Sequence, residues 1–305
     1  MHELLEDNYK TWDRLDYVKV PGGQVACYIY NDDLSLPSVI ALNGGPGVPC
    51  DYIRESHSFL ANGSYRFIAF DQLGTGLSDR SDDVRLYTLK RYCEEVDAVR
   101  QALVNGPAHI LGHSWGGWLA IEYACTFGEH LLSLILEDTC ADIPFLRSEL
   151  NILRSALGPE ILQMMLAHEA AGTFEHPEYK AAITLLDYRH VCRLKERPAA
   201  LHRSINNMSE HIYEHMQGPN EFVYTGELAN WNRVKEIKSV HCPVLIIVGQ
   251  FDEITSNCAE QMYQKFPNVE MELFLESSHT PFFEEPEKFR ETLLKFLDTL
   301  QKQRN

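Results

Sequence analysis

The segment Gly112-His113-Ser114-Trp115-Gly116 constrains the fold of this chain more than any other feature. It lies between an apolar run, Ala108 to Leu111, and a helical run, Trp115 to Phe127. A serine between two glycines in this position is typical of a sharp turn from a strand into a helix, because larger side chains at the glycine positions would clash. The pattern predicts a strained backbone at Ser114 and a hydroxyl at a sheet edge, at the positive end of a helix. We expect His113 to point away and pack.

Other short apolar runs, regularly spaced and bounded by turn residues, predict the rest of the sheet. Residues 17–30 have the pattern of a β-hairpin with its turn at Pro21-Gly22-Gly23. The later runs alternate with helical segments, which is typical of an open, mostly parallel, doubly wound α/β sheet. The strands are expected at 38–42, 66–70, 108–111, 132–136, 244–248 and 270–275, and the helices at 89–104, 115–127, 256–266 and 285–303.

One interval is too long for a simple connection between neighbouring strands. About 100 residues separate the strand that ends near Glu137 from the next one, whereas a crossover needs only about a dozen. Its pattern is helical, which predicts an inserted helical cap over the sheet edge that carries Ser114. We expect a core of residues 1–140 and 226–305 and a cap of residues 141–225. The cap helices are expected at 144–157, 159–171, 178–193 and 199–216.

Composition excludes several classes of protein. The 305 residues carry a formal net charge of −17, which argues against nucleic acid or an anionic membrane as a partner. No apolar run approaches the ~20 residues of a membrane span, and the acidic segment 1–7 does not have the pattern of a signal peptide. The eight cysteines form no Cys-x-x-Cys motif, so we expect buried free thiols in a reducing, cytoplasmic compartment.

A serine hydroxyl is a weak nucleophile until a neighbouring base, usually a histidine oriented by a carboxylate, removes its proton. Backbone N–H groups then stabilise the oxyanion that forms. We expect these donors to be the amides of Trp115 and of Gly45, which lies in the loop Asn43-Gly44-Gly45-Pro46-Gly47. Glycines let such groups approach a ligand closely; the alternative is a plain Gly-Pro turn. No Gly-Lys-Ser/Thr follows, so the loop is not a usual phosphate loop.

Five segments that span most of the chain are specific as a set: Gly44-Gly45-Pro46-Gly47, Asp71-Gln72-Leu73-Gly74-Thr75-Gly76-Leu77-Ser78, Gly112-His113-Ser114-Trp115-Gly116-Gly117, Gly218-Pro219-Asn220-Glu221-Phe222 and Gly249-Gln250-Phe251-Asp252-Glu253. Together they resemble the proline iminopeptidase family of α/β-hydrolase serine peptidases. This family includes L-amino-acid amidases and the tricorn-interacting aminopeptidase. The family usually has a histidine before Gly-Gly-Pro-Gly, where this chain has Asn43. The resemblance implies an α/β-hydrolase fold with an inserted helical cap.

In the α/β-hydrolase fold the nucleophile, the acid and the histidine follow one another along the chain. Among 13 histidines, His279 follows the last predicted strand, where this fold places its base. Asp252 follows the strand at 244–248 and is expected to orient His279. Asp138, at the end of the preceding strand, is the alternative acid. Asp71 is expected to brace loops.

The resemblance also implies a substrate with a free amino group. In the family, acidic residues near the cap bind the substrate's ammonium, and the matching positions are Glu221 and Glu253. An ammonium removed from water requires charged acceptors; otherwise Glu221 is a solvated residue and Glu253 an acid at a helix start. We therefore interpret the chain as a serine hydrolase without metal or cofactor. It is expected to release an N-terminal amino or imino acid, proline-like or small and apolar, from short peptides or amino-acid amides through an acyl-enzyme.

Other functions use the same fold. An esterase, lactonase or thioesterase would have the same triad, and a deprotecting aminoacyl hydrolase of a biosynthetic pathway is a further alternative. A small-molecule receptor built on a hydrolase fold is disfavoured by the intact set of serine, aspartate and histidine. As a partner we expect a small molecule or short peptide with a free amino terminus, and neither nucleic acid nor membrane. The chain is expected to be a monomer or a small homo-oligomer.

Overall fold

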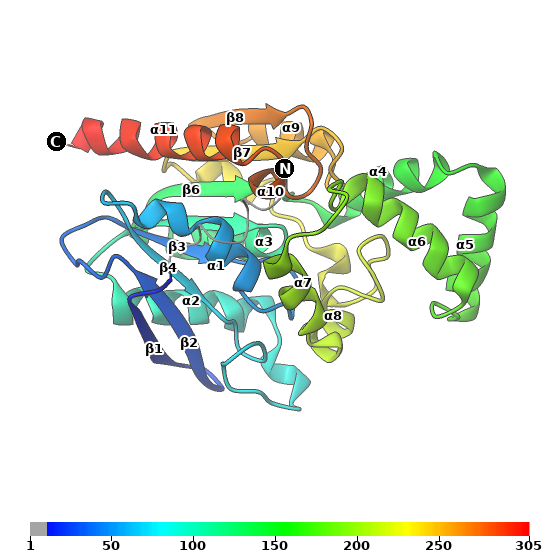
Figure 1. Cartoon of the computed structure of the whole chain (residues 1–305), viewed down its shortest axis with the longest axis horizontal. Helices are drawn as coiled ribbons and strands as arrows, with labels where there is room; N and C mark the ends of the chain where they lie inside the picture. Colours follow the sequence, from blue (N-terminus) through cyan, green and yellow to red (C-terminus); the bar gives the residue numbers. More distant parts are fainter. Residues whose placement is uncertain (1–10, 305) are drawn as a thin grey trace.

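Eight strands form one mostly parallel sheet in the computed structural model, which describes residues 11–304 (Figure 1). The order of the strands is β1-β2-β4-β3-β5-β6-β7-β8. The predicted hairpin is formed by β1 (Arg14–Val20) and β2 (Gly23–Tyr30), and β2 also pairs antiparallel with β4 (Arg66–Phe70). All other pairs are parallel. The remaining strands are β3 (Ser38–Leu42), β5 (Ala108–His113), β6 (Leu131–Glu137), β7 (Val244–Gly249) and β8 (Val269–Phe274).

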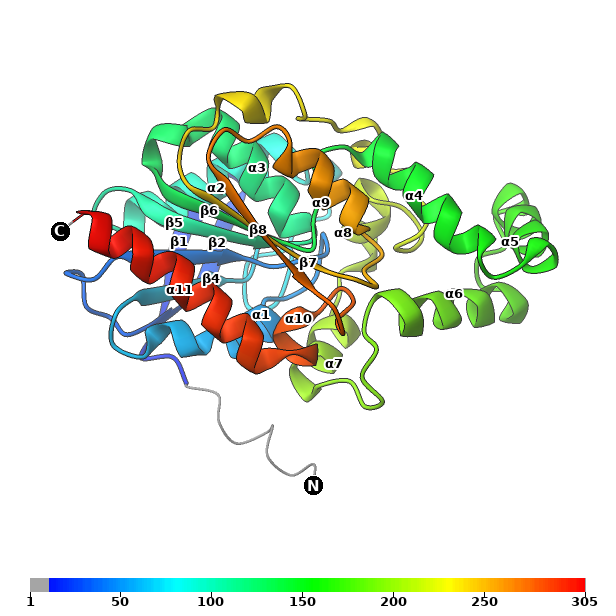
Figure 2. The same ribbon diagram turned by 90° about the horizontal axis from the view of Figure 1, so that it is seen from above.

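Helices cover both faces of the sheet, which confirms the doubly wound architecture (Figure 2). Because successive side chains of a strand point to opposite faces, Ile40 and Leu42 belong to one buried cluster and Val39 and Ala41 to another. The first cluster packs under α2 (Leu89–Leu103), α3 (Trp115–Phe127) and α9 (Ser256–Tyr263). The second packs under α1 (Asp51–Ser56), α10 (Pro281–Glu284) and α11 (Pro286–Arg304).

Five α-helices occupy the long interval between β6 and β7 in which a cap is expected. In both views α4, α5 and α6 project beyond the sheet, whereas α7 lies against the core near α1 (Figures 1 and 2). The limits of the cap at residues 141 and 225 stay a prediction. The helices are α4 (Ile143–Ser155), α5 (Pro159–Ala171), α6 (Pro177–His190), α7 (Ala199–Asn206) and α8 (Glu210–Met216).

The single helix predicted over residues 199–216 is wrong, because the structure divides it into α7 and α8. The break follows from contacts with the core. The N–H of Ser209 donates to the carbonyl of Gly47 at 2.8 Å, and the Ser204 hydroxyl accepts a hydrogen bond from the N–H of Tyr52 at 3.1 Å. These contacts hold the segment between α7 and α8 against the loop that follows β3 and the start of α1.

The cysteines and the helices test two expectations that were drawn from composition. All eight cysteines are free thiols, and six of them are buried. Across residues 11–304, no helix combines the length and the apolar character that crossing a bilayer requires. Residues 1–7, where we expect no signal peptide, lie outside the described residues.

Parallel strands place their carboxyl ends at one edge of the sheet, and this edge gathers the segments singled out in the sequence. The strand β5 lies between β3 and β6, with Gly112 beside Leu42 and His113 beside Glu137. The loops after β3, β5, β6, β7 and β8 carry, in that order, Gly45, Ser114, Asp138, Asp252 and His279.

Candidate active site

Ser114 has the strained backbone that its motif predicts. Its φ is 56° and its ψ is −123°, in a region that non-glycine residues seldom adopt. The flanking glycines are required by close backbone packing. A Cβ on Gly112 would lie 2.2 Å from the carbonyl oxygen of Gly116, and a Cβ on Gly116 would lie 2.0 Å from that of Leu42. The turn therefore depends on both glycines.

The structure brings His279 and Asp252 into direct contact. The imidazole Nδ1 lies 2.7 Å from Oδ1 of Asp252, which also accepts a hydrogen bond from the N–H of Ile254 at 2.9 Å. Both side chains are buried. Burial alone would lower the pKa of His279, but the negative charge of Asp252 and its hydrogen bond raise this pKa above its ordinary value. Asp138, the alternative acid, instead accepts a hydrogen bond from the N–H of Gly249 at 3.0 Å.

His113 connects the serine turn to the histidine loop, a role beyond the expected packing. Its Nε2 donates to the carbonyl of His279 at 2.8 Å, and the two rings lie 4.7 Å apart between centroids. Its Nδ1 lies 2.6 Å from the hydroxyl of Tyr52. Burial and the nearby charge of His279 lower the pKa of His113 well below its ordinary value, so the ring is neutral. Ser114, the next residue, makes no hydrogen bond to His279 in this structure.

The loop after β3 lies against Ser114, and hydrogen bonds fix the backbone of Gly44 and the side chain of Asn43 in this loop. A Cβ on Gly44 would lie 3.2 Å from the Cβ of Ser114, and the N–H of Gly44 donates to the hydroxyl of Tyr52. The side chain of Asn43 donates to the carbonyls of Gly44 and Val48 at 2.9 and 2.7 Å. Asn43, at the position where the family usually has a histidine, thus braces this loop through its amide.

Gly45 and Trp115 retain backbone donors that no acceptor within residues 11–304 uses. Gly45 has a φ of +128°, which favours glycine, and a Cβ there would lie 3.0 Å from the nitrogens of Gly47 and Val48. Trp115 is the first residue of α3, where N–H groups lack partners within the helix. Its indole donates to Gln72 at 2.9 Å, which holds the side chain away from the backbone amide.

Glu221 lies near the end of the chain interval in which we expect a cap, whereas Glu253 follows β7, beyond that interval. Glu253 is 2% exposed, its Oε1 lies 3.7 Å from Nε2 of His279, and its Oε2 has no hydrogen-bond partner among residues 11–304. Burial raises the pKa of Glu253 well above its ordinary value, and the charges of Glu221, Asp252 and Asp187 act in the same direction. Glu221 accepts a hydrogen bond from the amide of Gln217 at 2.8 Å.

Asp187 is a third carboxyl of this group that the sequence analysis did not identify. It lies in the last turn of α6, and the carbonyl of His190 in the same turn accepts the N–H of Glu253 at 3.1 Å. Burial raises the pKa of Asp187 to about 7, with the charge of Glu221 acting in the same direction and that of Arg197 opposing it. No local motif distinguishes this aspartate from other acids on a half-exposed helix.

Two groups of three side chains, each of a type that can bind a metal ion, occur among residues 11–304. One, formed by Asp138, Asp252 and His279, is part of this site, and the hydrogen bond between Asp252 and His279 already occupies one ligand atom of each. The other, His168, His176 and Glu178, lies largely exposed at the start of α6 and the end of α5.

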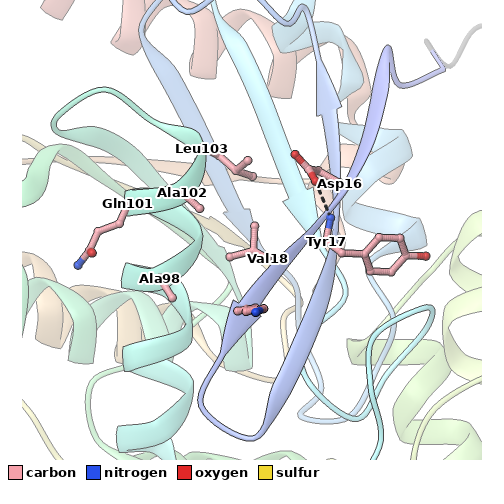
Figure 3. Close-up of a pocket in the computed structure, with 8 residues that line it drawn as sticks. Asp16, Tyr17, Val18, Ala98, Gln101, Ala102 and Leu103 are labelled. Atoms are coloured by element: carbon pink, nitrogen blue, oxygen red, sulfur yellow. Dashed lines mark hydrogen bonds between the residues drawn. The ribbon is translucent and has the colours of Figure 1, made fainter.

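A surface hollow of about 450 Å³ lies between β1 and α2 and shares no residue with the site (Figure 3). Figure 3 shows Ala98, Ala102 and Leu103 along one wall, and the hydroxyl end of Tyr17 directed away from them. The hollow has no histidine, cysteine or serine in its lining. The site at the carboxyl edge of the sheet is therefore the candidate active site.

Comparison with known proteins agrees with this geometry. Residues 37–286 match the family described as the alpha/beta hydrolase fold. The proline iminopeptidase of Saccharolobus solfataricus is 31% identical over 284 residues, which are 92% of this chain and 91% of that protein. The one from Heyndrickxia coagulans is 33% identical over 285 residues, with coverage of 93% and 98%.

A solved structure is also similar over nearly the whole chain. The crystal structure of proline iminopeptidase from Mycobacterium smegmatis has a TM-score of 0.88 and 30% identity, and the match covers 96% of this chain and 100% of that one. Together with the serine turn and the adjacent histidine–aspartate pair, these matches establish the relationship. The chain belongs to the proline iminopeptidase family of α/β-hydrolases.

Proposed function

We propose that this protein is a serine aminopeptidase that releases an N-terminal amino or imino acid, proline-like or small and apolar, from short peptides or amino-acid amides. The observation that carries the proposal is the buried hydrogen bond of 2.7 Å between His279 and Asp252. His113, the residue before Ser114, connects this pair to the serine turn through its hydrogen bond to the carbonyl of His279. Relatives named proline iminopeptidase support the substrate class.

The side chains at the sheet edge divide the chemistry among them. Ser114 Oγ attacks the carbonyl carbon of the N-terminal residue while Nε2 of His279 takes its proton. Asp252 holds the imidazole in the tautomer that has Nε2 free, through the bond to Nδ1. The amides of Gly45 and Trp115 donate to the oxyanion. The carbon–nitrogen bond then breaks, His279 gives its proton to the leaving amine, and water releases the acyl group by the same route.

The free amino group of the substrate is bound by carboxylates in this proposal. Glu253 has a buried oxygen without a partner and lies beside the base, and Glu221 is oriented by Gln217. A substrate ammonium would supply the donors that these oxygens lack. The position of Glu253 next to His279 places the amino group close to the carbonyl that is attacked, as removal of a single terminal residue requires.

The experiment compares free and blocked substrates. We expect the p-nitroanilides of L-proline and L-alanine to be hydrolysed and their N-acetyl forms to lose kcat/KM by roughly 30-fold or more, because a charged contact is removed from a buried site. Glu221→Gln should reduce kcat/KM for the free substrates only, while Glu227→Gln, an exposed neighbour, serves as the matched control. Equal rates on free and blocked substrates would favour the esterase, lactonase or thioesterase alternative.

The location of the enzyme is part of the same proposal. Eight free cysteines, most of them buried, support a reducing compartment such as the cytoplasm. We propose a small-molecule or short-peptide substrate as its partner there.

A further inference from the structure

Asp138 occupies a position whose backbone disfavours most side chains. It is the first residue after β6, and its N–H donates to the carbonyl of Ile247 in β7 at 2.8 Å. Its φ is +47°, in the left-handed region, and its side chain is fully buried. Glycine would fit this backbone with less strain. A carboxyl group held there against both strain and burial calls for a role beyond packing.

The hydrogen bonds of Asp138 and Asp252 leave one oxygen of each unsatisfied. Oδ1 of Asp138 accepts from Gly249, and Oδ1 of Asp252 accepts from His279 and Ile254. Oδ2 of Asp138 and Oδ2 of Asp252 have no partner among the described residues. An oxygen of each carboxyl group and a ring nitrogen of His279 all lie within 4.8 Å of one another.

Two buried carboxylates at this separation do not both stay ionised at neutral pH. Asp252 already has a partner that favours its ionised form, because its Oδ1 accepts a hydrogen bond from the imidazole of His279. Burial raises the pKa of Asp138 well above its ordinary value; the charges of Asp252 and Glu137 act in the same direction, and the hydrogen bond from Gly249 opposes them. We therefore expect the proton to lie on Asp138, which makes Asp138 a donor that can satisfy Oδ2 of Asp252.

We propose that Asp138 is a positioning residue that, as a neutral carboxylic acid, donates a hydrogen bond to Asp252 and holds that carboxylate with its other oxygen facing His279. This role rests on the proposed triad, in which Asp252 orients the base. The chain Asp138–Asp252–His279 would keep one negative charge, not two, behind the imidazole. It would also fix the rotation of the Asp252 side chain, whose other hydrogen bonds within residues 11–304 are made by Oδ1.

The test compares Asp138→Asn with Asp138→Ala in the full chain. Asparagine tolerates the left-handed backbone, accepts from Gly249 and donates to Asp252 without charge, so it reproduces the proposed state. We expect Asp138→Asn to keep kcat/KM within about threefold of the wild type and to leave the pKa of the acidic limb of its pH profile unchanged. Asp138→Ala should lower kcat/KM about tenfold or more, mainly through kcat, since Oδ2 of Asp252 loses its donor.

A measurement that needs no substrate separates this inference from the proposed function. The low-field proton resonance of the His279–Asp252 hydrogen bond, followed by NMR against pH, should titrate alike in the wild type and in Asp138→Asn. If Asp138 were ionised, its neutralisation would lower the pKa of His279 by about one unit or more, which would overturn the inference whatever the substrate is. Failure of Asp138→Asn to fold, or equal activity of the Asn and Ala variants, would also contradict it.

Discussion

Glu253 is a buried residue whose Oε2 has no hydrogen-bond donor among residues 11–304. Its carboxyl is buried beside Asp252 and interacts with the charges of Glu221 and Asp187, and these together raise its pKa well above the ordinary value. We therefore expect this group to hold a proton in the free enzyme at neutral pH. A bound ammonium reverses the balance, because it favours the charged carboxylate and offers donors to the unpartnered oxygen.

Binding of a cationic ligand should consequently release a proton. With Ser114→Ala to prevent turnover, L-prolinamide binding at a pH near 6.5, where the ligand's amino group is already charged, should release up to about one proton per site. Isothermal calorimetry in buffers of different ionisation enthalpy measures this number. Adding Glu253→Gln should remove the release, whereas adding Glu227→Gln should not. Binding without proton release would show that Glu253 is already ionised in the free enzyme, contrary to this account.

At the level of elements, β5, the serine turn and α3 form one unit held by backbone packing. Gly116 lies where α3 crosses the end of β3, and its missing Cβ allows the contact with the carbonyl of Leu42. Gly128, at the other end of the same helix, is exposed in the right-handed helical region, and a Cβ added there would meet no atom within 4 Å. A side chain at Gly116 would therefore collide with the backbone of β3, whereas a side chain at Gly128 would have free space.

Alanine substitutions at the two ends of α3 should change the free energy of unfolding by different amounts. We expect Gly116→Ala to lower the free energy of unfolding by at least about 2 kcal/mol, because backbone must move to admit the methyl group. Gly128→Ala should change it by less than about 1 kcal/mol, in the stabilising direction. Chemical denaturation monitored by circular dichroism measures both. A Gly116→Ala protein as stable as the wild type would mean that the tight turn is not required.

The elements that the sequence predicted well are those set by local pattern. The strands β3 and β4 match their apolar runs residue for residue, since turn residues bound each run and both faces are buried. The division between α7 and α8 was missed because a long-range bond from Ser209 to Gly47 causes it. The short helix α1 was missed as well, since six residues carry little periodicity.

In the candidate site, too, the residues set by local sequence pattern were predictable, and those set by long-range contacts were not. The serine turn was predictable because its glycines and flanking patterns are local. Asp138 and Asp252 both follow neighbouring strands, so position left both open as the acid, and only the structure shows that Asp252 contacts His279. Tyr52 and Asp187 belong to no local motif, and their contacts with the site arise from packing between distant segments.

The whole molecule carries a formal net charge of −17. Such a field attracts cationic substrates over distances comparable to the Debye length. Salt shortens this length from about 30 Å at 0.01 M to about 10 Å at 0.1 M. The charge of the whole chain should therefore influence how substrates with free amino groups reach the site.

Raising the ionic strength over this range should lower kcat/KM for L-proline p-nitroanilide by about threefold or more, mainly through KM. The rate with neutral p-nitrophenyl acetate, measured in the same buffers, should change little and serves as the control. Steady-state kinetics in a non-binding salt provides both numbers. A cationic substrate whose rate is insensitive to salt would contradict electrostatic attraction by this chain.

The central claim is that Ser114 becomes nucleophilic through His279, and labelling with a fluorophosphonate followed by peptide mass spectrometry tests it most directly. We expect one adduct, on Ser114, that is absent in Ser114→Ala and forms about 10³-fold or more slowly in His279→Ala. Thermal melts of the variants check that each is folded. An adduct on another residue, or labelling of Ser114 at the wild-type rate in His279→Ala, would contradict the account.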